Sequence, residues 1–146
     1  AFWRDRQIVL SIVRTDGLAL RKVGGSLRND REVVLTAVRQ NWEALKDAPA
    51  EFRKDRGVMS AAVAQDASAF KLAPKEIWSD REVLLAAVKH DGAALQYASL
   101  RLRSDKELVM AAARSNPASL QYAAESLQGD ADVGQAAKSK LGRIPT

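Results

Sequence analysis

Aspartate and arginine recur together along the chain, and their charges offer its clearest capacity for chemistry. Aspartates stand at positions 5, 30, 55, 80, 105 and 130, a step of 25 residues, and a basic residue follows each of the first five. In a stack of repeats these cations would form a row along one edge, which could bind phosphates of nucleic acid or an acidic protein surface. The candidate anion-binding residues are Arg28, Arg31, Arg53, Arg56, Arg81 and Arg103.

The alternative for this edge is a solvated network of Arg–Asp and Arg–Glu pairs between neighbouring repeats. Ten basic and eight acidic residues gather around the repeat junctions, so the edge is nearly neutral. That balance favours ion pairs over a phosphate track. The formal net charge of +5 still favours an anionic partner for the chain as a whole.

The aromatic residues are the second candidate feature, because they interrupt the repeat pattern. Trp3 and Trp78 occupy a position that is arginine in other copies, and tryptophan is enriched at binding hot spots. Partial burial against a neighbouring loop is the alternative for the tryptophans. Tyr97 and Tyr122 occupy equivalent positions, so we expect them to line one surface. The candidate partner-binding residues are Trp3, Trp42, Trp78, Tyr97 and Tyr122.

Catalytic and metal-binding patterns are not found in the sequence. The chain has no cysteine and one histidine, His90, which we expect to be exposed near the end of a helix. Glycine-rich nucleotide signatures are absent. We therefore predict no catalytic, cofactor or metal site, and a protein that is not an enzyme. A chain without cysteine suits a reducing compartment, and no apolar run approaches the roughly 20 residues that a membrane span needs.

Each 25-residue copy predicts a first helix that its aspartate caps. The carboxylate can accept the free N–H groups of the first turn and suits the positive end of the helix dipole. Six mostly apolar residues follow, such as Val83 to Val88, which indicates a helix that neighbours bury on most sides.

A second helix is predicted eleven residues after each aspartate, where Asp or Asn stands as an N-cap. Its apolar residues lie three apart, which places them on one face. A further apolar residue stands three positions before the next aspartate, where it can pack beneath the helix junction. These anchors are Leu27, Phe52, Ile77, Leu102 and Leu127.

The pattern predicts an all-α protein, an α-solenoid of five two-helix repeats that fills a single domain over 1–141. The repeats are 5–29, 30–54, 55–79, 80–104 and 105–129, and a polar capping half-repeat covers 130–141. We expect residues 142–146 to form a flexible tail. At the other end Ile8, Val9, Leu10, Ile12 and Val13 are expected to be exposed, which favours a missing N-terminal segment or a partner there.

The repeat resembles the α-helical repeat family catalogued as domain of unknown function 4116. The resemblance rests on Asp-Arg-Glu-Val-x-Leu-x-Ala-Val followed by (Asn/Asp)-Gly-x-Ala-Leu-x-Tyr-Ala, and extends over about residues 2 to 130. Asp80 to Val88 with Asp91 to Ala98 is one close copy, and Asp105 to Ala113 with Asn116 to Ala123 is another. The third copy departs from the pattern at Gly57, Met59, Ser60 and Leu72. The resemblance implies a helical repeat module and no activity.

These observations favour a non-catalytic helical-repeat scaffold that mediates protein–protein interaction as a subunit or fragment of a larger assembly. A basic solenoid that binds nucleic acid or another polyanion is the first alternative. A non-catalytic region of a larger enzyme is the second.

Overall fold

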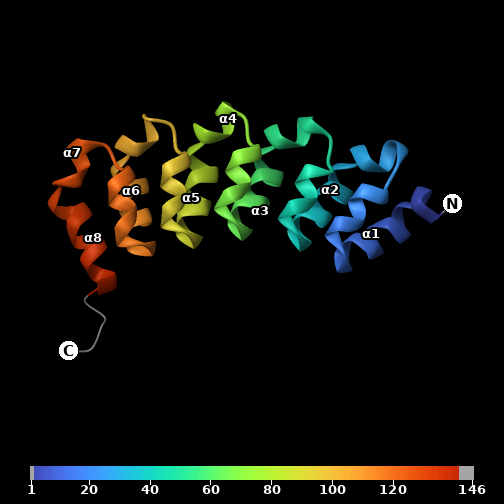
Figure 1. Cartoon of the computed structure of the whole chain (residues 1–146), viewed down its shortest axis with the longest axis horizontal. Helices are drawn as coiled ribbons and strands as arrows, with labels where there is room; N and C mark the ends of the chain where they lie inside the picture. The colour runs from blue at the N-terminus through green and yellow to red at the C-terminus, as the bar shows by residue number, and fades with distance from the viewer. Residues whose placement is uncertain (1, 142–146) are drawn as a thin grey trace. The chain divides into compact units, whose positions relative to one another are not determined.

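The computed structural model describes residues 2–141 and divides into two units, 1–74 and 75–146. The predicted tail at 142–146 lies outside the described residues. Every regular element among the described residues is helical (Figure 1). The all-α, repeated character of the fold is therefore confirmed, and each unit is described by itself below.

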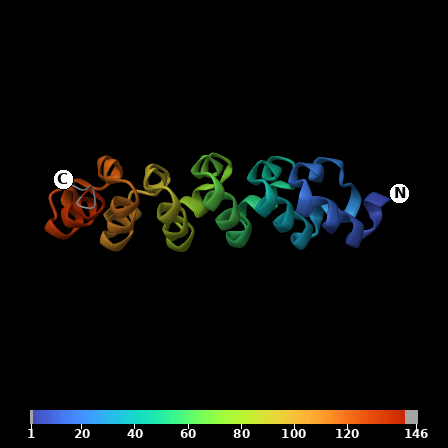
Figure 2. The same cartoon turned by 90° about the horizontal axis from the view of Figure 1, so that it is seen from below.

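Unit 1 holds three ten-residue α-helices that are separated by short 3₁₀ helices. In both views α1 is followed by α2 and then α3, and each packs against the next (Figures 1 and 2). The elements are η1 (Phe2–Arg4), α1 (Arg6–Thr15), η2 (Gly17–Lys22), η3 (Gly25–Asn29), α2 (Arg31–Gln40), η4 (Trp42–Lys46), η5 (Ala50–Lys54), α3 (Arg56–Gln65) and η6 (Ala67–Leu72).

Unit 2 repeats this order and ends on a longer helix. Here α5 packs against α6, and α6 against α8 (Figure 1). The elements are α4 (Lys75–Trp78), α5 (Arg81–His90), η7 (Gly92–Tyr97), η8 (Leu102–Ser104), α6 (Lys106–Ser115), η9 (Pro117–Tyr122), α7 (Glu125–Gln128) and α8 (Ala131–Leu141).

The predicted caps are present at both helix starts. Asp30 Oδ1 accepts the backbone N–H groups of Glu32 and Val33, and the other repeat aspartates cap their helices in the same way. Asn41 has two tasks. Its backbone N–H closes the last turn of α2 on Ala37 O at 2.9 Å, and its side chain accepts the N–H of Glu43 to begin η4. One extended residue therefore ends the α-helix and starts the next segment.

The prediction of two helices in each repeat is incomplete, because a third short helical segment follows the second, and the second is a 3₁₀ helix. Val23 N donates to Leu20 O at 3.0 Å, three residues back. A 3₁₀ helix has three residues per turn, so an apolar spacing of three puts Leu20 and Val23 on one face. The short third segment buries the anchors Phe52, Ile77, Leu102 and Leu127, while Leu27 is half-buried.

The core of each unit lies between the α-helices and the 3₁₀ helices. Val33, Val34, Ala37 and Val38 of α2 are all fully buried. The expected exposure of the first helix is wrong for Val9, Leu10 and Val13, which are buried because they face α2 and η2. Ile8 alone among the large hydrophobic residues of α1 stays exposed, at 43%, and Ile12 is half-buried.

The last helix, α8, has the predicted polar outer face. Ala136 and Ala137 pack against Ala113 of α6, while Gln135 and Lys138 are exposed. The helix therefore presents apolar residues on one side only, as a terminal repeat does.

Candidate interaction surfaces

The aspartates that begin the α-helices of unit 1 also join neighbouring repeats. Arg6 Nε donates to Asp30 Oδ2 at 2.8 Å, and Arg6 Nη2 bonds the Glu32 carboxylate. One repeat later, Arg31 donates twice to Asp55, at 2.7 and 3.0 Å. The cation that follows one helix cap thus reaches the cap of the next helix.

Unit 2 contains the same pairs with one substitution. Arg81 Nε donates to Asp105 Oδ2 and Arg81 Nη2 to Glu107 Oε2, both at 2.7 Å. Lys106 replaces arginine in the next repeat, and its ammonium lies 3.3 Å from Asp130 and 2.7 Å from Asp132. The partner is the aspartate 24 residues ahead in each of these pairs, so the register between repeats is set by charge as well as by packing.

Two of the cap aspartates divide their two oxygens between these tasks, while Asp55 Oδ1 accepts both the N–H of Val58 and Nη2 of Arg31. In Asp30 and Asp105, Oδ1 accepts backbone N–H groups of its own helix, while Oδ2 accepts the arginine of the preceding repeat. The hydrogen bond from that arginine is the main reason that the pKa values of Asp30, Asp55 and Asp105 fall below the usual range. These carboxylates are ionised and engaged at neutral pH.

A second set of arginines holds the ends of the 3₁₀ helices. Arg28 Nη2 donates to the carbonyl of Arg21 at 2.6 Å. Arg103 bonds the carbonyls of Gln96 and Ala98 in the same manner. These carbonyls face the end of a helix, where they have no partner within it. Arg28 and Arg103 therefore act as C-terminal caps.

The residues that replace arginine at this position show the same role in part. Gln128 donates its amide to Ala123 O at 3.0 Å, as Arg103 does to Ala98 O. The backbone carbonyl of Trp78 accepts the N–H of Ser99 at 3.0 Å, as that of Arg103 accepts the N–H of Ala124. Arg53 is half-buried, and its Nε has no hydrogen-bond partner.

The predicted anion-binding edge is thus largely occupied by contacts within the protein. Arg31 and Arg81 are in ion pairs, Arg28 and Arg103 bond carbonyls, and Arg56 also has a partner. Anion binding there stays a prediction, but a ligand would have to compete with these bonds.

The five candidate aromatic residues are all half-buried, and they fall in different settings. Trp42 begins η4, and the ammonium of Lys46 lies 5.4 Å from its ring centroid, a cation–π contact. Trp3 lines a hollow with Arg4 and Lys22. Tyr97 and Tyr122 end η7 and η9, which pack together in unit 2.

Leu100 is an exposed apolar residue that sequence reasoning missed. Its side chain is 81% exposed, and the N–H of the preceding residue, Ser99, bonds the carbonyl of Trp78. The backbones of Leu100 and Trp78 are therefore neighbours. Gly25, Ala50 and Lys75 occupy equivalent positions, so leucine here departs from the other copies.

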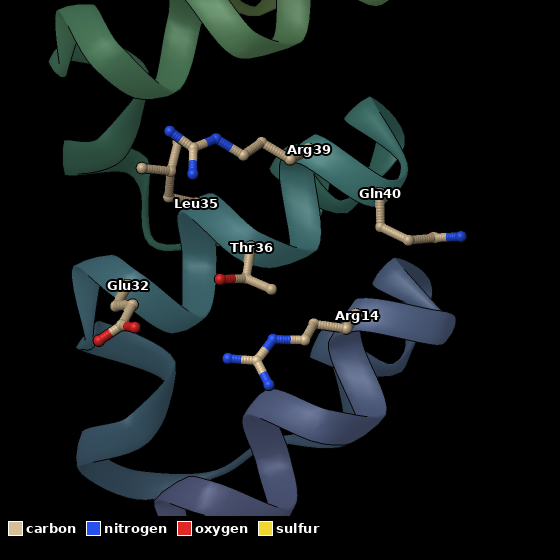
Figure 3. A pocket seen from close by; sticks show the side chains of 6 residues that line it. All are labelled: Arg14, Glu32, Leu35, Thr36, Arg39 and Gln40. Carbon is tan, nitrogen blue, oxygen red and sulfur yellow. The ribbon is translucent and has the colours of Figure 1, made fainter.

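A shallow hollow of about 450 Å³ lies over α2 in unit 1. Arg14 of α1 lines it together with Glu32, Leu35, Thr36 and others of α2. In Figure 3 the Arg14 side chain points toward Thr36, and Arg39 extends past Leu35 on the other side. The full lining is Arg14, Glu32, Leu35, Thr36, Arg39 and Gln40.

Sequence reasoning also missed the polar residue that ends each α-helix. Gln40 Oε1 accepts the N–H of Gly17 at 2.6 Å, and Gln65 Oε1 accepts that of Trp42 at 2.8 Å. In unit 2, Ser115 Oγ accepts the N–H of Gly92 at 3.1 Å. Each side chain pairs a free donor at the start of a 3₁₀ helix in the preceding repeat. The polar character of this position in every copy was the available signal.

His90 is exposed at the end of α5, as the sequence predicts. Among residues 3–139, whose side chains are described, no group of three or more His, Cys, Asp or Glu is placed to hold a metal ion. Within the described part of the chain, no helix is both long and apolar enough to cross a membrane.

The family model described as domain of unknown function (DUF4116) matches the chain three times, at residues 5–53, 55–100 and 80–128. The chain belongs to this family. Two of the matches begin at Asp5 and Asp80, and the third at Asp55, so each starts on an aspartate that caps an α-helix. No curated protein and no solved structure matches the chain.

Proposed function

We propose that this chain is a non-catalytic helical-repeat scaffold that binds protein partners in a larger assembly. In this proposal the five repeats from residue 5 to 129 continue as one α-solenoid, and α8 closes it. The chain supplies no chemistry of its own. The description of its family names no activity, and the proposal therefore rests on the residues.

The proposal rests on one observation: positions that recur in the repeats and positions that differ between them have different structural roles. Positions that recur in the copies, such as Asp30, Asp55 and Asp105, are used to cap helices and to join repeats. Positions that differ between copies, such as Leu100 and Trp42, are exposed or half-buried. A framework with a fixed register and a variable surface is how repeat proteins build extended binding faces.

The nucleic-acid alternative has less support than the protein-binding role. A phosphate track needs several free cations in a row, because the affinity comes from released counterions. Arg31 and Arg81 are already paired with Asp55 and Asp105. Binding of mixed-sequence RNA or DNA that falls steeply with salt would favour this alternative.

Affinity capture tests the scaffold role. The tagged chain is incubated with extract of its own cells, and bound proteins are cross-linked and quantified. We expect a defined partner that the Leu100→Ser variant captures less well, since this change removes an exposed apolar side chain without touching the core. Ile8→Ser is the matched control, because it removes an exposed isoleucine from unit 1.

Two results would overturn the proposal. One is a monodisperse chain that captures no partner at physiological salt. The other is catalytic turnover by the isolated chain in a broad substrate screen.

A further inference from the structure

Arg14 and Arg39 of unit 1 have unpaired guanidinium groups, in contrast to the arginines that bond the cap aspartates. Arg14 and Arg39 are exposed and stand at equivalent places, one residue before the end of α1 and of α2. Among the described residues, neither guanidinium makes an ion pair or a hydrogen bond. Cations near a helix C-terminus suit the helix dipole, but that interaction leaves all their donors open to a ligand.

These free arginines line the hollow over α2, and its one acidic residue is engaged. Glu32 bonds Arg6 from the preceding repeat, so its charge is largely offset. Leu35 is half-buried beside Arg39, with Thr36 between it and Arg14, and offers an apolar surface. The hollow thus combines two unpaired cations with an apolar floor.

We propose that the hollow formed by Arg14, Leu35 and Arg39 binds an acidic segment of a partner protein. One carboxylate of the segment pairs with each guanidinium, and an apolar side chain between the carboxylates covers Leu35. The planar fork of arginine donates two parallel hydrogen bonds to a carboxylate, which fixes the direction of approach. This assignment rests on the scaffold role and names the chemistry of one partner.

Two features favour an acidic peptide over nucleic acid. The equivalent residue of α3 is Ala64, so only α1 and α2 of unit 1 have a cation at this position. Leu35 has no use in phosphate binding, whereas it can pack with an apolar residue of a peptide.

The proposed contacts are exposed, so their contribution should be modest and sensitive to salt. Exposed ion pairs contribute little individually, and rim charges act mainly on the rate of association. The site is thus one contact of a larger interface. The test must compare variants under low-salt conditions.

The probe is a synthetic peptide, Glu-Leu-Glu-Leu-Glu, blocked at both ends and titrated into the whole chain by calorimetry and by NMR. The double variant Arg14→Gln/Arg39→Gln should bind it roughly five- to tenfold more weakly, the loss expected for two exposed ion pairs. Arg14→Lys/Arg39→Lys should be intermediate, because lysine keeps the charge and loses the fork. Lys71→Gln is the control, since Lys71 is exposed in the same unit and lies outside the hollow.

The matched peptide Gln-Leu-Gln-Leu-Gln should not bind, and circular dichroism should show that all variants are folded. Equal affinity of the double variant and the wild type overturns the proposal. So does binding of single-stranded RNA at this site with the acidic peptide excluded. If the double variant binds the peptide as the wild type does and still captures the wild-type partners from extract, the site assignment fails while the scaffold role stands.

Discussion

The two units share a framework and differ in the charge that they present. Residues 1–74 contain 13 Lys and Arg against nine Asp and Glu, a net of +4, while residues 75–146 contain ten against nine, a net of +1. Both units nevertheless contain the same caps and the same arginine–aspartate pairs. The excess charge of unit 1 is therefore additional to the framework.

The 3₁₀ helices show where the two units diverge. One exposed position is basic in unit 1 and glutamine in unit 2, and the position after it is tyrosine only in unit 2. The basic residues are Arg21, Lys46 and Lys71, and their counterparts are Gln96 and Gln121. The comparison teaches that contacts between repeats restrict some positions and leave others to specialise. Four experiments test it.

The largest effect should follow from Gly17→Ala in unit 1 and Gly92→Ala in unit 2. A Cβ atom at either glycine would lie 2.3 Å from a backbone oxygen of the next α-helix, Ala37 O or Ala112 O. Overpacking against backbone should lower the free energy of unfolding by about 2 kcal/mol in each case. Urea denaturation measures the loss, and native-state hydrogen exchange shows which unit loosens.

The control for these variants is Gly134→Ala in α8, where an added Cβ meets nothing within 4 Å. Alanine favours a helix over glycine, so this change should stabilise the protein by about 0.5–1 kcal/mol. A harmless Gly92→Ala alongside a damaging Gly17→Ala would show that the two units are not built alike.

The next largest loss of stability should distinguish an aspartate that only caps a helix from one that also bonds the neighbouring repeat. Asp105→Ala removes the N-cap of α6 and the partner of Arg81, whereas Asp5→Ala removes only a cap. Loss of an N-cap costs about 1 kcal/mol, so Asp5→Ala should cost that amount and Asp105→Ala more. Asp55→Ala should match Asp105→Ala by the same thermal or urea assay. Equal costs for all three would mean that the ion pairs contribute nothing measurable.

A smaller effect of opposite sign is expected at Ser119 in unit 2. Its hydroxyl is buried without a hydrogen-bond partner, and alanine occupies the equivalent positions, such as Ala44 and Ala94. Ser119→Ala should raise the free energy of unfolding by about 1 kcal/mol. The reverse change, Ala94→Ser, should lower it by a similar amount. Destabilisation by Ser119→Ala would point to a hydrogen bond at this hydroxyl in solution.

The smallest effect is expected on the stability of the protein at acidic pH. The folded-state pKa values of Asp30 and Asp105 lie below the usual range, so each pair adds stability above the unfolded pKa of about 3.9 and loses it as the pH falls through the folded value. Asp30→Asn and Asp105→Asn should each flatten the decline of stability below about pH 4. Urea midpoints between pH 2.5 and 6 would test this, with Asp132→Asn in the same scan as an exposed comparison.

The caps could be predicted from the sequence because capping is local chemistry. An aspartate before an apolar run meets the N–H groups of its own first turn wherever the helix lies, so Asp5 and Asp30 need no tertiary information. The anchors at Phe52 and Leu102 follow for a similar reason, since their apolar character recurs at a fixed distance from the cap.

The partners across repeats could be predicted only as a class. The near balance of charge at the junctions indicates ion pairs, but only the stack decides that Arg81 meets Asp105 and Glu107. The role of Arg103 could not be predicted from the sequence, because its acceptors are backbone carbonyls, whose positions depend on the fold. The unpaired arginines Arg14 and Arg39 could have been predicted, since they occupy equivalent positions in their repeats and have no acidic partner there.

The dual use of each cap aspartate has a consequence for how such a chain can change length. Arg6 and Asp30, or Arg81 and Asp105, match only when a whole repeat separates them. Gain or loss of a complete 25-residue copy inside a unit would restore every pair across the new junction, while any other insertion there would strand one cation and one carboxylate. These arginine–aspartate pairs thus permit growth by tandem duplication, and each new copy can then diverge at its exposed residues.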